Sequence, residues 1–316
     1  MRLLVLGGTS FVGRAIVDDA LRIGAEVTLF NRGRSGSGIF PGVPCRIGDR
    51  DSGDYASLSN GTWDAVADVS GYVPRHVGQA MKALGDRVTR YLFISSHAVY
   101  SETDLRPGSD EDTPRRAPRR DTEDLDQETY GPLKVACEDD VVDRYGDRAT
   151  IVRPGKVAGP YDPSDSFTYW VRRAATGGRV ALPGRPEQPV QLIDSRDLAR
   201  LVVQLLVDQR SGSFHAVGPS EPLTLGALIE ICARVAGTDV EIVPVTPRVV
   251  PPLFPLIKPV WATQQRSPAR ARAAGMPATP LARTAADVLA WDRERGQPPI
   301  RRGFSRVEEE RLLAAC

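Results

Sequence analysis

The chain has 316 residues and a formal net charge of +1, with acidic and basic residues interspersed along it. This length suffices for a large α/β domain or for two lobes, and the balanced charge predicts neither nucleic acid nor an anionic membrane as a partner. Four cysteines lack disulfide or metal-ligand spacing, and no segment resembles a secretion signal or a membrane span. We therefore expect a cytoplasmic protein without a metal site.

The first elements expected along the chain form a βαβ unit. Residues 2–6 are a short apolar run, which is typical of a buried parallel strand. Residues 11–23 have apolar side chains at helical spacing and are followed by Gly24, a common helix terminator. Residues 26–30 form the second strand. A unit of this kind at the start of a chain is typical of a dinucleotide-binding domain.

Strands and helices continue to alternate beyond this unit. The predicted strands cover residues 65–69, 90–95 and 149–153, and the predicted helices cover 74–84, a segment from Pro132 onward, and 197–208. This alternation predicts an α/β fold with a doubly wound parallel (Rossmann) sheet. We expect residues 1–153 to form the NAD(P)-binding domain and residues 154–316 to form a smaller substrate-binding lobe.

Residues 102–128 differ in character from their surroundings. They contain several prolines, two arginine pairs and a run of acidic residues, which predicts a long surface loop inserted into the first domain. Two interpretations remain open for this loop. It is either a solvated, mobile insertion or a lid or partner surface.

A glycine-rich turn joins the first strand to the first helix. It consists of Gly7, Gly8, Thr9, Ser10, Phe11, Val12 and Gly13. In this position exposed backbone N–H groups and the helix dipole favour the pyrophosphate of a dinucleotide. Ser10 stands where the usual pattern has its middle glycine, so the backbone is expected to lie slightly farther from the phosphates.

The end of the second strand predicts which dinucleotide binds. An acidic residue usually meets the free ribose hydroxyl of NAD there, but this chain has Asn31 and Arg32, followed by Arg34. A guanidinium group pairs well with a 2′-phosphate, which favours NADP, with NAD as the second possibility. The alternative is that these arginines only form a turn in an arginine-rich protein.

Three residues predict the chemistry. Tyr130 and Lys134 lie one helical turn apart, and an ammonium group near a phenol lowers the phenol's pKa toward neutrality. Ser96 follows a predicted strand at the carboxyl edge of the sheet, where it can hydrogen-bond a substrate carbonyl oxygen while Tyr130 transfers the proton. The alternative for Ser96 is that it caps the next element.

The assembled pattern resembles the extended or atypical short-chain dehydrogenases/reductases, which include the NAD-dependent epimerases and dehydratases. The resemblance rests on the glycine turn, on Ser96 with Tyr130 and Lys134, and on short motifs that begin at Gly48 and Arg153. It implies that Asp49 approaches the adenine, and that the cofactor site also includes Arg50, Ser70 and Gly71. It further implies that residues of about 188–218 return to the first domain, and it is compatible with a homodimer.

The substrate implied by this resemblance is a small polar carbonyl or alcohol. Lys156 stands where sugar-nucleotide enzymes usually carry asparagine, and Val190 where they carry arginine, so a nucleotide-diphosphate sugar is not favoured. An NADP-binding regulator or RNA-associated protein without turnover is the alternative, because the glycine turn also resembles that of the chloroplast stem-loop-binding branch. The retained Ser96, Tyr130 and Lys134 favour an enzyme.

Overall fold

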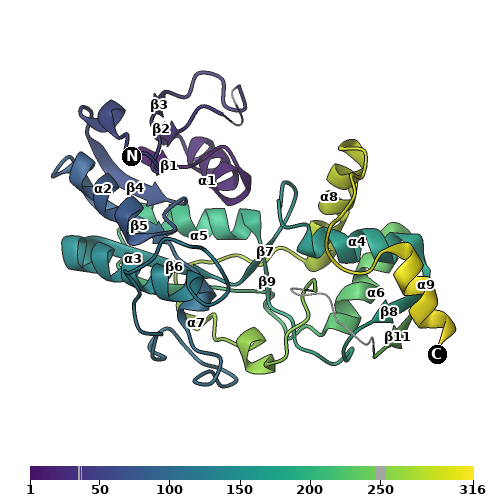
Figure 1. The fold of residues 1–316 in the computed structure, drawn as a ribbon. Coiled ribbons are helices and arrows are strands. Elements are labelled where there is room, and N and C mark those ends of the chain that lie inside the picture. The colour runs from purple at the N-terminus through teal and green to yellow at the C-terminus, as the bar shows by residue number, and fades with distance from the viewer. Residues whose placement is uncertain (35, 37, 247–253) are drawn as a thin grey trace. The chain divides into compact units, whose positions relative to one another are not determined.

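The computed structural model describes residues 1–34, 36, 38–246 and 254–316 (Figure 1). The chain forms two compact units. Unit 1 consists of Met1–Gly155, Ser195–Val217 and Arg266–Pro277, and unit 2 consists of Lys156–Asp194, Gly218–Gln265 and Ala278–Cys316. Arg266–Pro277 joins unit 1 without any motif that predicts it. No helix in these described ranges is both long and apolar enough to span a membrane.

Unit 1 is built around one parallel sheet. Within the described residues it has seven strands in the order β10-β6-β5-β4-β1-β2-β3, and every adjacent pair is parallel. The strands are β1 (Arg2–Leu6), β2 (Glu26–Asn31), β3 (Cys45–Ile47), β4 (Trp63–Asp68), β5 (Val88–Ile94), β6 (Ala149–Pro154) and β10 (Gly212–Ala216). The order runs outward from β1 in both directions, which confirms the predicted doubly wound sheet.

Helices of unit 1 pack in two pairs. Helix α1 (Phe11–Arg22) contacts α5 (Ser195–Val207), and α2 (Pro74–Leu84) contacts α3 (Tyr130–Tyr145). Apolar side chains of α2 and α3 form one buried cluster with strand side chains such as Tyr91. The shorter elements are the 3₁₀ turns η1 (Ala56–Leu58), η2 (His97–Val99) and η3 (Gly146–Arg148), and helix α7 (Ala269–Ala273).

The predicted bounds of these helices agree with the structure to within two residues, and the sequence predicts no end for α3. Helix α3 begins at Tyr130, two residues before the start at Pro132 that the sequence predicts. Proline is tolerated there because the first N–H groups of a helix have no partner within it. Helix α5 likewise begins two residues before its predicted start at Asp197.

Residues 102–128 form a loop without helix or strand, but the loop is tied to unit 1. Arg115 pairs with Glu138 at 3.0 Å and Arg120 pairs with Asp140 at 2.7 Å, and both acidic residues belong to α3. Leu105 and Glu111 are buried. These contacts attach the loop to unit 1 at several points, although most of its residues are exposed.

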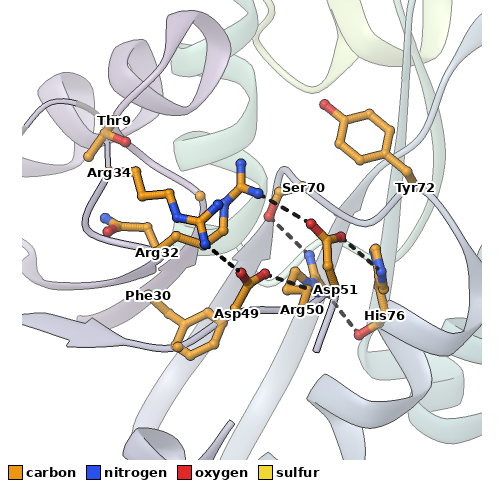
Figure 2. A pocket seen from close by; sticks show the side chains of 13 residues that line it. Thr9, Phe30, Arg32, Arg34, Asp49, Arg50, Asp51, Ser70, Tyr72 and His76 are labelled. Carbon is orange, nitrogen blue, oxygen red and sulfur yellow. Dashed lines mark hydrogen bonds and ion pairs between the residues drawn. The ribbon is translucent and has the colours of Figure 1, made fainter. Parts of the chain in front are cut away.

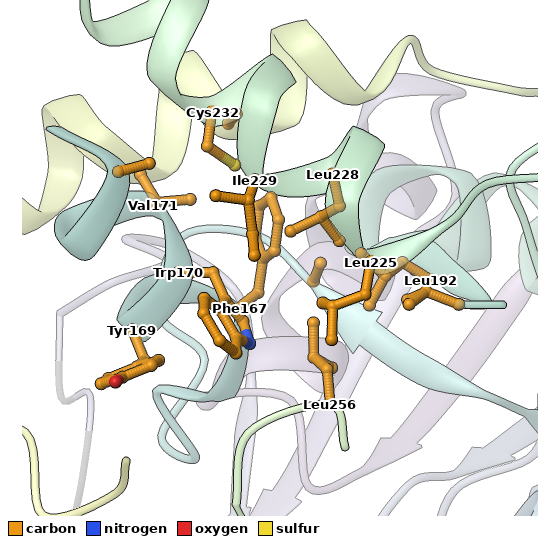
Figure 3. Close-up of a cluster of buried hydrophobic side chains, with 14 of the residues drawn as sticks. Phe167, Tyr169, Trp170, Val171, Leu192, Leu225, Leu228, Ile229, Cys232 and Leu256 are labelled. Atoms are coloured by element: carbon orange, nitrogen blue, oxygen red, sulfur yellow. The ribbon is translucent and has the colours of Figure 1, made fainter. Parts of the chain in front are cut away.

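Unit 2 has its own hydrophobic core. Helices α4 (Ser166–Thr176), α6 (Leu225–Ala236) and α8 (Leu281–Glu294) contact one another, and the fully buried Trp170 lies with Phe167 and Ile229 in the cluster between them (Figure 3). The remaining elements are the paired strands β8 (Gly178–Leu182) and β11 (Val240–Pro244), the paired strands β7 (Lys156–Ala158) and β9 (Leu192–Asp194), the 3₁₀ turn η4 (Trp261–Gln264) and helix α9 (Arg306–Ala314).

Candidate functional site

The turn between β1 and α1 depends on glycine at defined positions. Gly7 and Gly8 have φ angles of 104° and 108°, which residues with a side chain rarely adopt. A Cβ atom on Gly13 would lie 2.7 Å from the backbone nitrogen of Gly8, so the absence of a side chain lets α1 approach the turn. Ser10 replaces the usual glycine without strain because its φ of −130° is extended. The first turn of α1 can therefore present its N–H groups at the end of β1.

A pocket of about 350 Å³ lies beside this turn (Figure 2). Its lining comes from the segments at the carboxyl ends of β1, β2, β3 and β4, which meet at one edge of the parallel sheet, and from the first turn of α2. The lining residues are Gly7, Thr9, Phe30, Asn31, Arg32, Arg34, Gly48, Asp49, Arg50, Asp51, Ser70, Tyr72 and His76. Several of the predicted cofactor residues are thus brought together, including Gly7, Asn31, Arg32 and Ser70.

Opposite charges face each other at the rim of the pocket (Figure 2). The Arg32 guanidinium lies 3.2 Å from the Asp51 carboxylate, and Arg34 lies 3.6 Å from Asp49. Asn31 accepts a hydrogen bond from the backbone N–H of Gly33 at 2.8 Å, which shapes the turn after β2. The two arginines that favour a 2′-phosphate therefore each have a carboxylate partner. Sequence reasoning missed the partnership with Asp51.

Arg50 lines the pocket, but its guanidinium group is directed into the protein. It forms two hydrogen bonds to Asp68, at 2.6 and 2.7 Å, and donates to the Ser70 hydroxyl and to the carbonyl of His76. Although burial raises the pKa of Asp68, the charge and hydrogen bonds of Arg50 hold it below the usual value. Arg50 therefore holds the segment after β3 against the end of β4, beside the pocket.

Ser70 and Gly71 follow the end of β4 and have different surroundings. The Ser70 hydroxyl donates to the carbonyl of Leu6 at 3.1 Å and lines the pocket. Gly71 is buried, and a Cβ atom there would lie 2.7 Å from Val77 and 2.8 Å from Phe93. The contribution of Gly71 is therefore its backbone, which packs closely against α2 and β5.

The predicted hydroxyl pair is present. Ser96 caps η2 by accepting a hydrogen bond from Ala98 at 3.1 Å, and its side chain lies near enough to the Tyr130 phenol to lower the phenol's pKa. Gly131 explains how α3 comes so close, because a Cβ atom there would lie 2.1 Å from the carbonyl oxygen of Ala98. Ser96 thus has both of the roles considered from the sequence, as a cap and as the neighbour of Tyr130.

Lys134 is buried beneath Tyr130 (2% exposed). Its ammonium group donates to the carbonyls of Gly71 at 2.6 Å and Ile94 at 2.9 Å, and it lies 4.6 Å from the ring centre of Phe93 and 6.0 Å from that of Tyr130. Burial lowers the pKa of Lys134. The ammonium group is held by backbone carbonyls and aromatic faces rather than by a carboxylate.

The direction of the Tyr130 pKa shift corrects the sequence expectation. Burial raises the pKa of Tyr130 above its ordinary value of about 10, and the hydrogen bond with Ser96 offsets only part of this effect. The sequence predicts a pKa lowered by Lys134, whereas desolvation of the phenol is the largest effect on the Tyr130 pKa in the structure.

A buried network supports α3 from its other side. Arg153 donates to both carboxylate oxygens of Glu138 in α3, at 2.9 and 2.7 Å, and to the hydroxyl of Tyr100 at 2.6 Å. The Tyr100 hydroxyl is 2.7 Å from Nε2 of His215.

No group of three His, Cys, Asp or Glu side chains in the described part of the chain is arranged to hold a metal ion.

One segment of the chain matches a known protein family. Residues 64–217 match the model of the NAD dependent epimerase/dehydratase family, a segment that runs from β4 to just beyond β10. This match covers just under half of the chain.

A sequence relative carries a different function in its name. The chloroplast stem-loop binding protein of 41 kDa b from Arabidopsis thaliana is 26% identical over 264 residues. The match covers 78% of this chain and 66% of that protein, so the chain spans just under two thirds of the relative's length.

Solved structures match over nearly the whole chain. The Bordetella bronchiseptica enzyme WbmH in complex with NAD⁺ is 18% identical, with a TM-score of 0.70 and coverage of 93% of this chain and 99% of that one. The UDP-glucuronic acid 4-epimerase from Bacillus cereus in complex with NAD is 15% identical, with a TM-score of 0.70 and coverage of 94% and 98%. At these identities the likeness concerns the fold.

The close approach at Gly13 leads to the first testable prediction. We expect Gly13→Ala to weaken dinucleotide binding by about tenfold or more, because the new methyl group would push α1 away from the backbone of Gly8 at an overpacking cost of about 1–3 kcal/mol. Titration calorimetry with NADP⁺ measures the change. Gly78→Ala is the matched control, because Gly78 is also helical but a Cβ atom there meets nothing within 4 Å. Equal affinities in the two variants would contradict the assigned role of the turn.

Proposed function

We propose that this protein is an NADP-dependent enzyme, an oxidoreductase or epimerase/dehydratase, that acts on a small polar carbonyl or alcohol. The main support is the grouping of Ser96, Tyr130 and Lys134 within unit 1, at the same sheet edge as the pocket. These are the hydroxyl, phenol and ammonium groups that proton transfer at a carbon-bound oxygen requires. The family supports nucleotide binding, and the residues of this chain support the finer assignment.

The residues of the pocket fit a dinucleotide. Gly13 has no side chain where a Cβ atom would meet the backbone of Gly8, so α1 begins close to the turn. A pyrophosphate at the turn can therefore reach the N–H groups at the start of α1. Asp49 would receive the adenine, and Arg32 would pair with a 2′-phosphate. When bound, the nicotinamide would supply or accept a hydride. The protein's own side chains would orient the substrate and transfer the proton.

Ser96 and Tyr130 would act on the substrate oxygen. Ser96 orients that oxygen by hydrogen bonding, and Tyr130 donates its proton as negative charge develops there. Because burial raises the pKa of Tyr130, the phenol is protonated near pH 7 and is ready to act as an acid. The protonated phenol is the form that reduction of a carbonyl requires, whereas oxidation of an alcohol requires its conjugate base.

Lys134 would hold a positive charge beneath the site. Two of its three N–H donors go to the carbonyls of Gly71 and Ile94, which leaves one donor for a further acceptor. Its Nζ atom stays within 6.0 Å of the Tyr130 ring centre, so it would stabilise a phenolate once the proton has been transferred. The rigid carbonyl contacts keep this charge in position throughout.

The cofactor assignment predicts a preference that binding measurements can detect. We expect NADPH to bind about tenfold more tightly than NADH, and Arg32→Ala to remove most of this difference by weakening NADPH binding alone, because a hydrogen bond to a charged group contributes about 1.5–3 kcal/mol. Quenching of protein fluorescence gives both dissociation constants. Arg119→Ala removes an exposed arginine outside the pocket and is the control. A wild-type preference for NADH would contradict the proposal.

The catalytic assignment predicts a selective loss of turnover. We expect Tyr130→Phe to lower NADPH-dependent reduction of small hydroxy- or carboxy-substituted aldehydes and ketones by about 10²- to 10⁴-fold, with NADPH affinity near that of wild type. Tyr145→Phe is the matched control on the same helix. Its buried hydroxyl has no hydrogen-bond partner among the described residues, so its activity should be unchanged. Full turnover by the Tyr130 variant would rule out this role.

The Arabidopsis relative favours a second candidate function, which is binding of stem-loop RNA. The arginine pairs of the 102–128 loop are the feature of this chain that such a function would use. Arg115 and Arg120 instead face acidic residues of α3, and Arg119 pairs with Asp121 at 2.8 Å. Arginines that are already paired release few counterions from a phosphate backbone, which weakens this candidate.

An RNA-binding measurement separates the two candidates. We expect the wild-type protein to bind a stem-loop RNA no more tightly than about 10⁻⁶ M at about 150 mM salt, the range of non-specific binding. We also expect the Arg116→Ala/Arg119→Ala/Arg120→Ala variant to bind about equally. Fluorescence anisotropy with the stem-loop and with a single strand of the same composition provides the comparison. Tight binding that prefers the stem-loop and weakens in the triple variant would favour the RNA function.

A further inference from the structure

Asp51 occupies a distinctive place at the rim of the pocket. One of its carboxylate oxygens lies 3.2 Å from Nη1 of Arg32, and the other lies 3.5 Å from Nε2 of His76 (Figure 2). The Arg32 side chain is 50% exposed and the Asp51 side chain 67% exposed. An ion pair as exposed as this one contributes little stability and exchanges partners readily. Asp51 is therefore a weak partner for the arginine that would meet a 2′-phosphate.

The backbone fixes Asp51 in this place while its side chain remains accessible. The N–H of Asp51 donates to the carboxylate of Asp49 at 3.1 Å, and its carbonyl accepts from Arg75 at 3.3 Å. Arg75 also donates to the carbonyl of Arg50 at 3.2 Å and is anchored by two hydrogen bonds of 2.7 Å to Glu123. Asp51 is thus held in front of Arg32 by contacts that do not involve its own carboxylate.

The charges at the rim balance. Arg32 and Arg34 face Asp51 and Asp49, so two positive groups are opposed by two negative groups. A phosphate at this rim can pair with the arginines only if it shares them with their carboxylate partners or displaces those partners. Asp49 also caps the backbone of residue 51, whereas the Asp51 carboxylate has no backbone hydrogen bond among the contacts of the described residues. Asp51 is the partner that can be changed without altering the turn.

We propose that Asp51 competes with the 2′-phosphate of the cofactor for Arg32, and so sets the preference for NADP over NAD below the value that the arginine alone would give. This inference rests on the proposed NADP site. Asp51 is a specificity-determining residue in this reading, because a cofactor without a 2′-phosphate leaves the Arg32–Asp51 pair intact. Its removal should affect one cofactor and not the other.

The test is a double-mutant cycle on cofactor binding, which needs no substrate. Titration calorimetry with NADP⁺ and NAD⁺ is carried out on wild type, Asp51→Asn, Arg32→Ala and the double variant. We expect Asp51→Asn to tighten NADP⁺ binding by about two- to fivefold, the equivalent of one exposed ion pair, and to leave NAD⁺ binding unchanged. In the Arg32→Ala background the same substitution should have no measurable effect, because the residue it competes for is absent.

Asp121→Asn is the matched control. It removes the same charge from another exposed aspartate, 71% exposed and paired with Arg119, so an equal gain there would indicate a general charge effect. The inference is overturned if Asp51→Asn leaves NADP⁺ binding unchanged, or if its gain persists in the Arg32→Ala background. A wild-type preference for NAD⁺ contradicts the cofactor proposal itself and takes this inference with it. A wild-type preference for NADP⁺ without an effect of Asp51→Asn contradicts the inference alone.

Discussion

The buried ion pair between Arg50 and Asp68 is the interaction on which the rest of the candidate site depends. It joins the end of β4 to the segment after β3, and the same guanidinium group reaches the carbonyl of His76 in α2. Loss of one partner would leave an uncompensated buried charge, at a cost of about 3–5 kcal/mol. Because the pKa of Asp68 is lowered, the pair's contribution to stability is complete above about pH 4 and is lost as the pH falls through the lowered value.

Burial also shifts the pKa values of the candidate catalytic side chains. Tyr130 and Lys134 are both desolvated, and desolvation favours the neutral form of each, so it raises one pKa and lowers the other. Close backbone packing makes this burial possible, since Gly131 and Gly71 have no side chains where α3 meets η2 and where β4 ends beside α2. The Arg153–Glu138 pair then holds the next turns of α3. Position and protonation state therefore have a common origin in packing.

The sequence predicts those features that depend on local patterns. Apolar periodicity located the longer helices and the five central strands of unit 1, but not β3, β10 or α7. The glycine turn and the Tyr130–Lys134 spacing located the candidate site. Features that depend on contacts between distant residues were not predictable. An arginine next to Asp49 gives no sign that its side chain turns inward to Asp68. The loop at 102–128 has the composition of a mobile segment, but its arginines find acidic partners on α3 that only the fold brings near.

The sign of the Tyr130 pKa shift was beyond reach for a related reason. Residue spacing shows that a lysine is near a tyrosine, but the balance between charge and desolvation depends on what surrounds both groups. The sequence likewise does not single out Asp51 among its many aspartates, because only the fold places Asp51 next to Arg32. Placement in three dimensions converts an ordinary residue type into a specific partner.

The contact between Arg75 and Glu123 links the inserted loop to the candidate pocket. Glu123 lies within the loop, and Arg75 uses its remaining donors to hold the carbonyls of Arg50 and Asp51. Selection should therefore act on positions 75 and 123 as a pair, so that a descendant of this chain that lost the insertion would need another anion for Arg75 or would lose the arginine as well. The insertion and the candidate pocket thus share one structural support.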